Sequence, residues 1–258
     1  MEAASHDQAI RVSVCLAAYN GDKYIIEQIS SILPQLEQRD ELIVVDDAST
    51  DTTADLVSGI CDNRVKLLRS PKNSGYVKTF ERAMFASQGD YIFLADQDDV
   101  WLPGRVDAMI HALSAAEVVA SNFAFFGGKP RTIESIRLRS RDSSRRGANL
   151  FALWVGYRPY YGCAMAVRRE ALDLILPFPP FLLETHDQWI ALVGNLRGRI
   201  VHLEEETLIR RLHSDNNTPK SWRGLGVILH ARWMLLRAFL EASSRIYRKD
   251  RAESQVLA

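Results

Sequence analysis

Short apolar runs alternate with segments of helical periodicity through about the first 120 residues of the chain. Apolar runs that predict buried strands cover 12–18, 42–45, 65–68 and 91–95, and helical spacing covers 23–36, 50–60 and 77–86. Strands that alternate with helices favour right-handed crossovers and a mostly parallel sheet. The pattern therefore predicts an α/β fold with a mostly parallel central sheet flanked by helices.

The alternation ends near Gly127. Residues 129–146 hold seven lysines and arginines among serines, which predicts a mobile loop, either a solvated insertion or a phosphate-binding segment. Further elements are expected at 163–167 and 199–203 as strands, near 187–196 as a helix, and over 222–249 as a long amphipathic helix. We therefore expect one domain over 1–220 and a C-terminal helical extension over 221–258.

Three carboxylates follow the fourth apolar run, in the string Asp96-Gln97-Asp98-Asp99. A helix is expected to resume at Pro103, because proline is favoured at the first helical position. Carboxylates this close repel one another, and they stay ionised together most easily when a cation lies between them. The string therefore predicts a site for a hard divalent cation beside a phosphorylated ligand.

Polar residues also follow the first two apolar runs, in the stretches 17–21 and 46–51. The carboxyl ends of strands in an open α/β sheet share one crevice, where such folds bind ligands. There the Tyr19 ring would cover a nucleobase, and the Asp46 carboxylate would accept a hydrogen bond from a base or a ribose. Three residues of the second stretch could instead form a turn and cap the following helix without binding a ligand: Asp47, Ser49 and Asp51.

Taken together, three segments, 14–21, 43–52 and 89–99, resemble the nucleotide-sugar glycosyltransferases of family 2, which have the GT-A fold. The resemblance implies inverting transfer of a sugar from a nucleoside diphosphate, without a covalent enzyme intermediate. It also implies a nucleotide-binding half over 1–127 and an acceptor half over 128–220.

Roles for the strand-end residues follow from this resemblance. Asp98 is implied to be a direct ligand of Mg²⁺ or Mn²⁺, and Asp99 is expected to fix the loop. Asp96 is expected to face the ribose or the metal. The expected nucleotide-sugar-binding residues are Ala18, Tyr19, Asn20, Asp46, Lys78, Asp96 and Gly162.

The second half keeps three landmarks of the family. Gly162 would let backbone approach the donor sugar, although it could also simply precede a buried strand. Asp187 is implied to be the general base, with helix capping as its alternative role. His186 replaces the usual glutamate and would orient Asp187 or contact the acceptor. His213 is implied to reach back to the metal, although a lone histidine is usually a surface residue.

Three cationic side chains are candidates for the diphosphate. Arg210 and Arg211 precede His213, and Lys78 lies beside the predicted crevice, although it could equally be a surface lysine.

The formal net charge of zero hides an asymmetry between the halves. Residues 1–127 carry a net charge of −9, which suits the binding of a metal ion. Residues 128–258 carry a net charge of +9, which suits the binding of phosphate groups or an anionic membrane surface. The three cysteines form no CxxC pair, and the polar N-terminus lacks a signal-peptide core. We therefore expect a cytoplasmic protein, peripheral on the inner face of the membrane if its last helix lies in the interface. Core docking or a homodimer contact are the alternatives for that helix.

The resemblance favours a metal-dependent glycosyltransferase of surface polysaccharide synthesis, acting on a saccharide or lipid-linked acceptor. The strings around Asp98 and Asp187 look most like members that extend O-antigen or exopolysaccharide chains, including rhamnosyltransferases. A nucleotidyltransferase would need a glycine-rich phosphate loop after the first strand, and a dinucleotide oxidoreductase would need GxGxxG there; neither is present. A non-catalytic nucleotide-sugar or carbohydrate-binding module remains the alternative, and nothing in the sequence suggests a nucleic acid partner.

Overall fold

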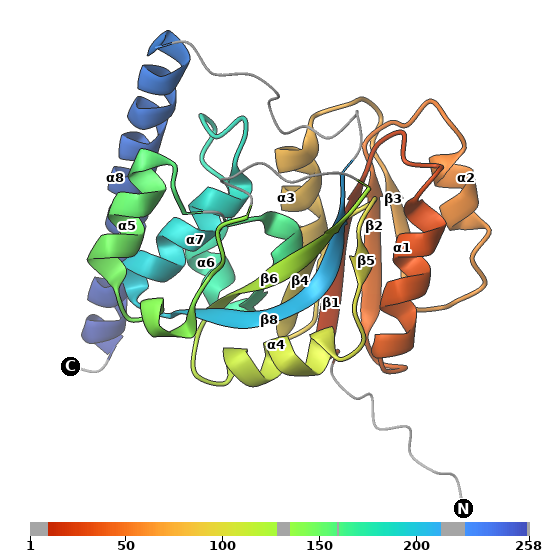
Figure 1. Cartoon of the computed structure of the whole chain (residues 1–258), viewed down its shortest axis with the longest axis horizontal. Coiled ribbons are helices and arrows are strands. Elements are labelled where there is room, and N and C mark those ends of the chain that lie inside the picture. Colours follow the sequence, from red (N-terminus) through yellow and green to blue (C-terminus); the bar gives the residue numbers. More distant parts are fainter. Residues whose placement is uncertain (1–9, 128–134, 159, 213–224, 257–258) are drawn as a thin grey trace, which may run out of the picture.

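A computed structural model describes residues 10–127, 135–158, 160–212 and 225–256 (Figure 1). Eight strands of this part of the chain form one sheet in the order β3-β2-β1-β4-β7-β6-β8-β5. The strands are β1 (Val12–Ala18), β2 (Glu41–Asp46), β3 (Val65–Arg69), β4 (Tyr91–Asp96), β5 (Val100–Trp101), β6 (Val118–Phe126), β7 (Met165–Arg168) and β8 (Ile200–Arg211). Pairing among β1 to β4 is parallel, whereas β7 pairs antiparallel with both β4 and β6.

Helices cover both faces of the sheet (Figure 1). They are α1 (Ile25–Ile32), α2 (Thr53–Ser58), α3 (Tyr76–Ala86), α4 (Arg105–Leu113), α5 (Arg146–Val155), α6 (Leu172–Ile175), α7 (His186–Arg197) and α8 (Leu225–Val256). One core cluster joins α1, α2 and α4 to the sheet, and a second joins α3, α6, α7 and α8 to its other face. The α/β fold expected from the sequence is confirmed.

The four strands predicted in the first half agree with the structure to within one residue, and three helices, α1, α2 and α4, begin later than expected. The polar stretch after β2 forms a loop until α2 starts at Thr53, whose N–H donates to the Asp51 carboxylate at 3.0 Å. The expected capping by Ser49 is wrong, because its hydroxyl instead accepts the N–H of Asn20. Likewise α4 starts at Arg105, two residues after Pro103.

The chain from β6 onwards departs further from the prediction. The sequence pattern predicts neither β6 nor α5, and it predicts a strand that ends at residue 203, before the glutamates at 204–206. In the structure β8 continues through them and pairs in parallel with β6, with register shifts near Asn122. The side-chain amide of Asn122 donates hydrogen bonds to the backbone carbonyls of Leu138 and Glu204, and these bonds stabilise the irregular stretch.

The predicted C-terminal helix is present as α8. Leu235, Ala238 and Ala242 are buried, and the two alanines belong to the second core cluster, so one face of the helix docks on the domain. Among the described helices, none combines the length and apolar character needed to cross a bilayer.

Candidate donor, metal and base site

Strand register gathers the predicted nucleotide-site residues at one edge of the sheet. Ala18 lies opposite Asp46 on β2, and the neighbouring Ala17 lies opposite Asp96 on β4. Two of the loops beyond these strands are tied together, because the Asn20 side chain accepts the N–H of Thr50 at 2.8 Å. Asn20 therefore fixes the shape of the crevice.

Gln97, to which the sequence analysis gave no role, holds Tyr19 in place. Its amide accepts the Tyr19 N–H at 2.8 Å and donates to the Tyr19 carbonyl at 3.0 Å. A Cβ on Gly21 would lie 2.2 Å from this amide, so the glycine makes room for it. The Tyr19 side chain is left 44% exposed, which fits a ring available to stack on a base.

Asp46 and Asp47 have separate roles. The Asp47 carboxylate accepts hydrogen bonds from the N–H groups of Ser74 and Gly75, and so it holds the turn before α3. Asp46 is buried, and one of its oxygens accepts the N–H of Ser49. Its other oxygen, Oδ1, has no hydrogen-bond partner within the described part of the chain. A buried acceptor in this state fits a donor group on a ligand.

Carboxylates from the Asp96-Gln97-Asp98-Asp99 string converge beyond β4. Ligand atoms of Asp96, Asp99 and Cys163 lie within 4.8 Å of one another. Burial, followed by the charge of Asp98, raises the pKa of Asp96 to about 7. Burial and the charge of Asp96 likewise raise the pKa of Asp99. Proton uptake or a bound cation would relieve this repulsion.

These residues fit a hard divalent cation. Asp99 uses Oδ1 to accept the N–H of Arg211, as expected of a loop-fixing residue, while its buried Oδ2 finds no partner among the described residues. Burial raises the pKa of the Cys163 thiol, which stays neutral and is a poor ligand for Mg²⁺ or Mn²⁺. Carboxylates, and not the thiol, are therefore the side chains of this cluster that suit a divalent cation. His213, the other predicted ligand, lies outside the described residues.

Three arginines surround the acidic cluster. Arg211 donates from Nε to the carbonyl of Asp98 at 3.1 Å, so it holds the loop. Arg105, which the sequence analysis did not single out, donates to the carbonyl of Cys163 at 2.7 Å. Arg210 is buried with its guanidinium 4.4 Å from the centre of the Tyr161 ring. Burial alone would lower its pKa, but nearby negative charge raises it overall. Of the three, Arg210 is placed best to meet a diphosphate.

Asp187 lies at the start of α7. Its charge is one of the contributions that raise the pKa of Asp96, so the two carboxylates interact electrostatically. Burial raises the pKa of Asp187 to about 6, although hydrogen bonds from the N–H groups of Gln188 and Gly162 oppose this shift. Asp187 is the second residue of α7, so its bond to the Gln188 N–H satisfies a donor of the first helical turn, and the helix has no side-chain cap at Thr185. A carboxylate with this pKa is suited to accept a proton near neutral pH.

His186, the residue before Asp187, is buried away from solvent. Its ring stacks on Phe80 with centroids 4.4 Å apart, and burial lowers its pKa to about 3. It is therefore a neutral packing residue. A Cβ on Gly162 would lie 2.6 Å from its Nε2, so His186 explains why residue 162 is a glycine.

Gly162→Ala should lower the transfer rate while the protein stays folded. The added methyl group must displace His186 or the backbone whose N–H bonds Asp187. We expect a loss of roughly 10²-fold, the scale of a misplacement of about 1 Å. Steady-state rates and thermal unfolding would be measured beside Gly147→Ala, since Gly147 has open space around its Cβ position. Equal rates for both variants would contradict this positioning role.

Lys78 does not join the residues gathered at the crevice. It is exposed on α3, and its ammonium pairs with Glu81 at 2.6 Å. The structure thus favours the surface role for this lysine over contact with phosphate.

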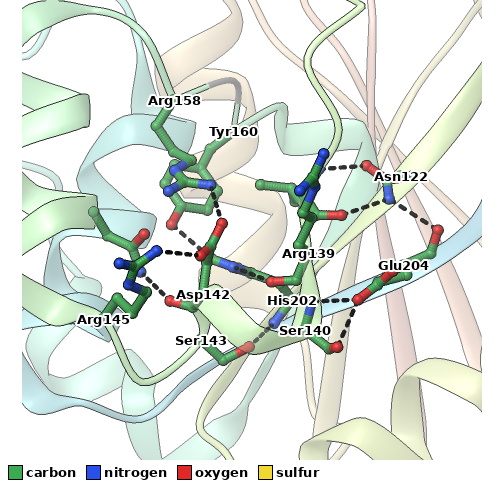
Figure 2. Close-up of polar contacts among 12 residues, drawn as sticks. Asn122, Arg139, Ser140, Asp142, Ser143, Arg145, Arg158, Tyr160, His202 and Glu204 are labelled. Atoms are coloured by element: carbon green, nitrogen blue, oxygen red, sulfur yellow. Dashed lines mark hydrogen bonds and ion pairs between the residues drawn. The ribbon is translucent and has the colours of Figure 1, made fainter.

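The described part of the basic segment is anchored to the sheet (Figure 2). Ser140 donates to the Glu204 carboxylate from its hydroxyl at 2.6 Å, and Asp142 pairs with Arg158. His202 is hydrogen-bonded to the Tyr160 hydroxyl at 2.8 Å, beside the segment that carries Gly162. Residues 135–145 thus form the expected loop with one short helical turn, and these contacts hold it against β8.

Comparisons with known proteins agree with this architecture. Residues 13–176 match the model of glycosyl transferase family 2. The chain is 25% identical over 217 residues to an uncharacterized glycosyltransferase of Nostoc sp., covering 81% of this chain and 66% of that protein. It is 30% identical over 125 residues to the Escherichia coli UDP-Glc:alpha-D-GlcNAc-diphosphoundecaprenol beta-1,3-glucosyltransferase WfaP, covering 48% of this chain and 50% of that protein. It thus spans about half to two thirds of the length of these relatives.

Solved structures share the fold. Staphylococcus aureus TarS in complex with UDP-GlcNAc superposes with a TM-score of 0.68 at 18% identity, covering 93% of this chain and 73% of that one. The mannosyltransferase PcManGT of Pyrobaculum calidifontis, in complex with GDP-Man and Mn²⁺, gives a TM-score of 0.61 at 18% identity, covering 95% and 76%. These likenesses show the GT-A type of fold, and the family model covers well over half of the sequence. The chain therefore belongs to glycosyl transferase family 2.

Proposed function

We propose that this protein transfers a sugar, with inversion, from a nucleoside diphosphate sugar to a saccharide or lipid-linked saccharide in surface polysaccharide synthesis. The observation that carries the proposal is Asp187, a carboxylate whose pKa is raised by burial and whose charge acts on Asp96 at the end of β4. Two carboxylate sites in one crevice suit separate tasks, one at the leaving diphosphate and one at the incoming hydroxyl.

The nucleoside end of the donor would lie on the half formed by residues 1–127. The Tyr19 ring would stack on the base, and the free Oδ1 of Asp46 would accept a hydrogen bond from it. Asp96 would face the ribose, and Gly162 would bring backbone close to the sugar. Residues 128–220 would then face the acceptor.

Departure of the diphosphate needs positive charge. Asp98 and Asp99 are the residues that would hold a Mg²⁺ or Mn²⁺ ion, and His213 is a further proposed ligand. When bound, the ion would offset the negative charge that develops on the leaving phosphate. Arg210 would add a fixed guanidinium charge from β8.

Asp187 would act on the opposite side of the sugar. Its carboxylate would take the proton of the acceptor hydroxyl while that oxygen attacks the anomeric carbon. Hydrogen bonds from Gly162 and Gln188 hold the carboxylate in place before the acceptor arrives. Attack from the side opposite the diphosphate would invert the anomeric configuration.

Relatives support the acceptor class. WfaP acts on a diphosphoundecaprenol-linked sugar, and another relative is a putative teichuronic acid biosynthesis glycosyltransferase of Bacillus subtilis. By analogy we propose a polysaccharide intermediate as the acceptor, reached on the cytoplasmic face of the membrane.

Transfer should depend on pH through Asp187. A raised pKa means that the folded protein holds this proton more tightly, so the base is lost as the pH falls through about 6. Below that value kcat/KM should fall roughly tenfold per pH unit, and above it the profile should level off. A kcat/KM profile measured at saturating metal tests this. A rate that stays constant well below this pKa would exclude Asp187 as the base.

A binding module without catalysis is the competing function. It could use Tyr19 and Asp46, but it would not need a poised base at residue 187. Incubation of the protein with a panel of nucleoside diphosphate sugars, metal and acceptor would separate the two. An enzyme releases free nucleoside diphosphate over time, whereas a module only binds the donor.

A further inference from the structure

The outward face of α8 carries apolar side chains that the domain does not cover. Leu229, Trp233 and Leu240 are 59–68% exposed, although they lie in a helix whose other face is docked. At about 100° per residue, these three positions and Leu236 fall within roughly 60° of one another around the helix. The buried residues Leu235, Ala238 and Ala242 lie on the opposite side. The first half of α8 therefore has two apolar faces, and the fold uses one of them.

Helix α5 extends this surface. Phe151 and Trp154 on α5, and Tyr157 just after it, are 49–65% exposed, whereas Leu153 on the other side of the helix is buried. The two helices touch, because Arg232 of α8 donates to the Val155 carbonyl at 2.9 Å. Figure 1 shows them together at the side of the molecule away from α1 and α2. The combined surface, here termed the aromatic patch, consists of Phe151, Trp154, Tyr157, Leu229, Trp233 and Leu240.

The charge around the aromatic patch is mostly positive, and Glu241, which follows Leu240, pairs with Arg245. The stretches 145–158 and 225–240 contain five arginines and no acidic residue. Arg232 and Arg237 flank the apolar stripe of α8 on either side, at about 60–80° from its centre. Asp142 pairs with Arg145 and so offsets part of this charge. Exposed tryptophan and tyrosine rings framed by arginines are typical of surfaces that lie in a membrane interface.

We propose that the aromatic patch docks the protein on an anionic lipid surface. The aromatic rings would enter the headgroup layer, and the flanking arginines would meet lipid phosphates. A second copy of this chain is less well matched. A twofold contact would set arginines against arginines, and these two stretches hold no acidic side chain to pair with them.

The position of the aromatic patch relative to the carboxyl ends of the strands also bears on how the protein would lie on a membrane. Helix α8 begins at the end of the molecule where β1, β2 and β4 end, and its apolar first half lies towards that end (Figure 1). Docking there would bring the crevice near the membrane surface. Membrane docking of this kind requires only the exposed apolar side chains and the flanking arginines, whether or not the protein transfers a sugar.

Vesicle flotation of the full chain, without nucleotide or metal, tests the proposal. Vesicles of phosphatidylglycerol and phosphatidylethanolamine would be compared with vesicles of phosphatidylcholine alone. The test variant is Trp154→Ser combined with Trp233→Ser. The control is Phe85→Ser, which removes a 60% exposed aromatic ring from α3, outside the patch. Thermal unfolding confirms that each variant is folded, and light scattering gives its oligomeric state.

We expect the wild type and Phe85→Ser to float with the anionic vesicles only, and to be released by salt. The double variant should bind those vesicles at least roughly tenfold more weakly, because binding scales with the apolar area inserted. Failure of the wild type to bind anionic vesicles would overturn the proposal, as would equal loss in Phe85→Ser. A wild-type dimer that the double variant abolishes would instead assign the patch to self-association.

Discussion

Replacing Asp187 with asparagine should abolish measurable transfer and leave donor binding intact. Asparagine keeps the shape of the side chain, but its amide cannot take a proton from the acceptor hydroxyl. We expect the turnover rate to fall by roughly 10²–10⁴-fold, the usual contribution of a positioned general base. Because the side chain is proposed to act on the acceptor, the dissociation constant of the donor should stay within a factor of about two.

Glu184→Gln is the matched control for this variant. Glu184 is an exposed carboxylate just before α7, so it tests the loss of a nearby charge without loss of the base. Nucleoside diphosphate release and donor binding would be measured for both variants. Normal turnover in Asp187→Asn would show that another group takes the proton.

Asp98→Ala should remove the dependence of donor binding on metal. Asp98 follows β4 in the acidic loop, and its charge acts on both Asp96 and Asp99. We expect the gain in donor affinity on adding Mn²⁺ to fall by roughly 10–100-fold. Loss of a residue that only hydrogen-bonds to a metal ligand typically costs this much metal affinity, and loss of the ligand itself should cost at least as much. Calorimetric titration of the donor with and without Mn²⁺ gives this gain directly.

Asp107→Ala provides the control, because Asp107 is exposed on α4 and lies away from the acidic loop. An unchanged metal effect in Asp98→Ala would exclude Asp98 as a ligand. If Asp99→Ala then removed that effect, the cluster of Asp96 and Asp99 would be the metal site instead.

Most of the first half of the fold could be predicted from the sequence, because the apolar residues there either form unbroken runs or recur at helical spacing. Runs such as Val12–Ala18 are almost entirely buried on both faces, so they appear as unbroken apolar stretches. In the second half, long-range contacts override the local pattern. The exposed glutamates at 204–206 look like a break, but pairing with β6 carries β8 through them.

The site divides in the same way. The placement of Asp46 and Asp96 at one edge of the sheet could be predicted, because parallel strands end at a common edge. Gln97 and Arg105 act through backbone groups of Tyr19 and Cys163, and such contacts leave no spacing signal in the sequence. The burial of His186 was equally hidden, because its neighbours Phe80 and Gly162 are distant along the chain.

We propose that this protein transfers the sugar of the donor to an acceptor and does not only bind the donor. The most direct measurement follows release of free nucleoside diphosphate from a panel of donor sugars, with Mn²⁺ and a lipid-linked saccharide acceptor. The account predicts acceptor-dependent release from at least one donor, and its loss in Asp187→Asn while that donor still binds. Saturable donor binding with no release, identical in the wild type and Asp187→Asn, would contradict it and identify a binding module.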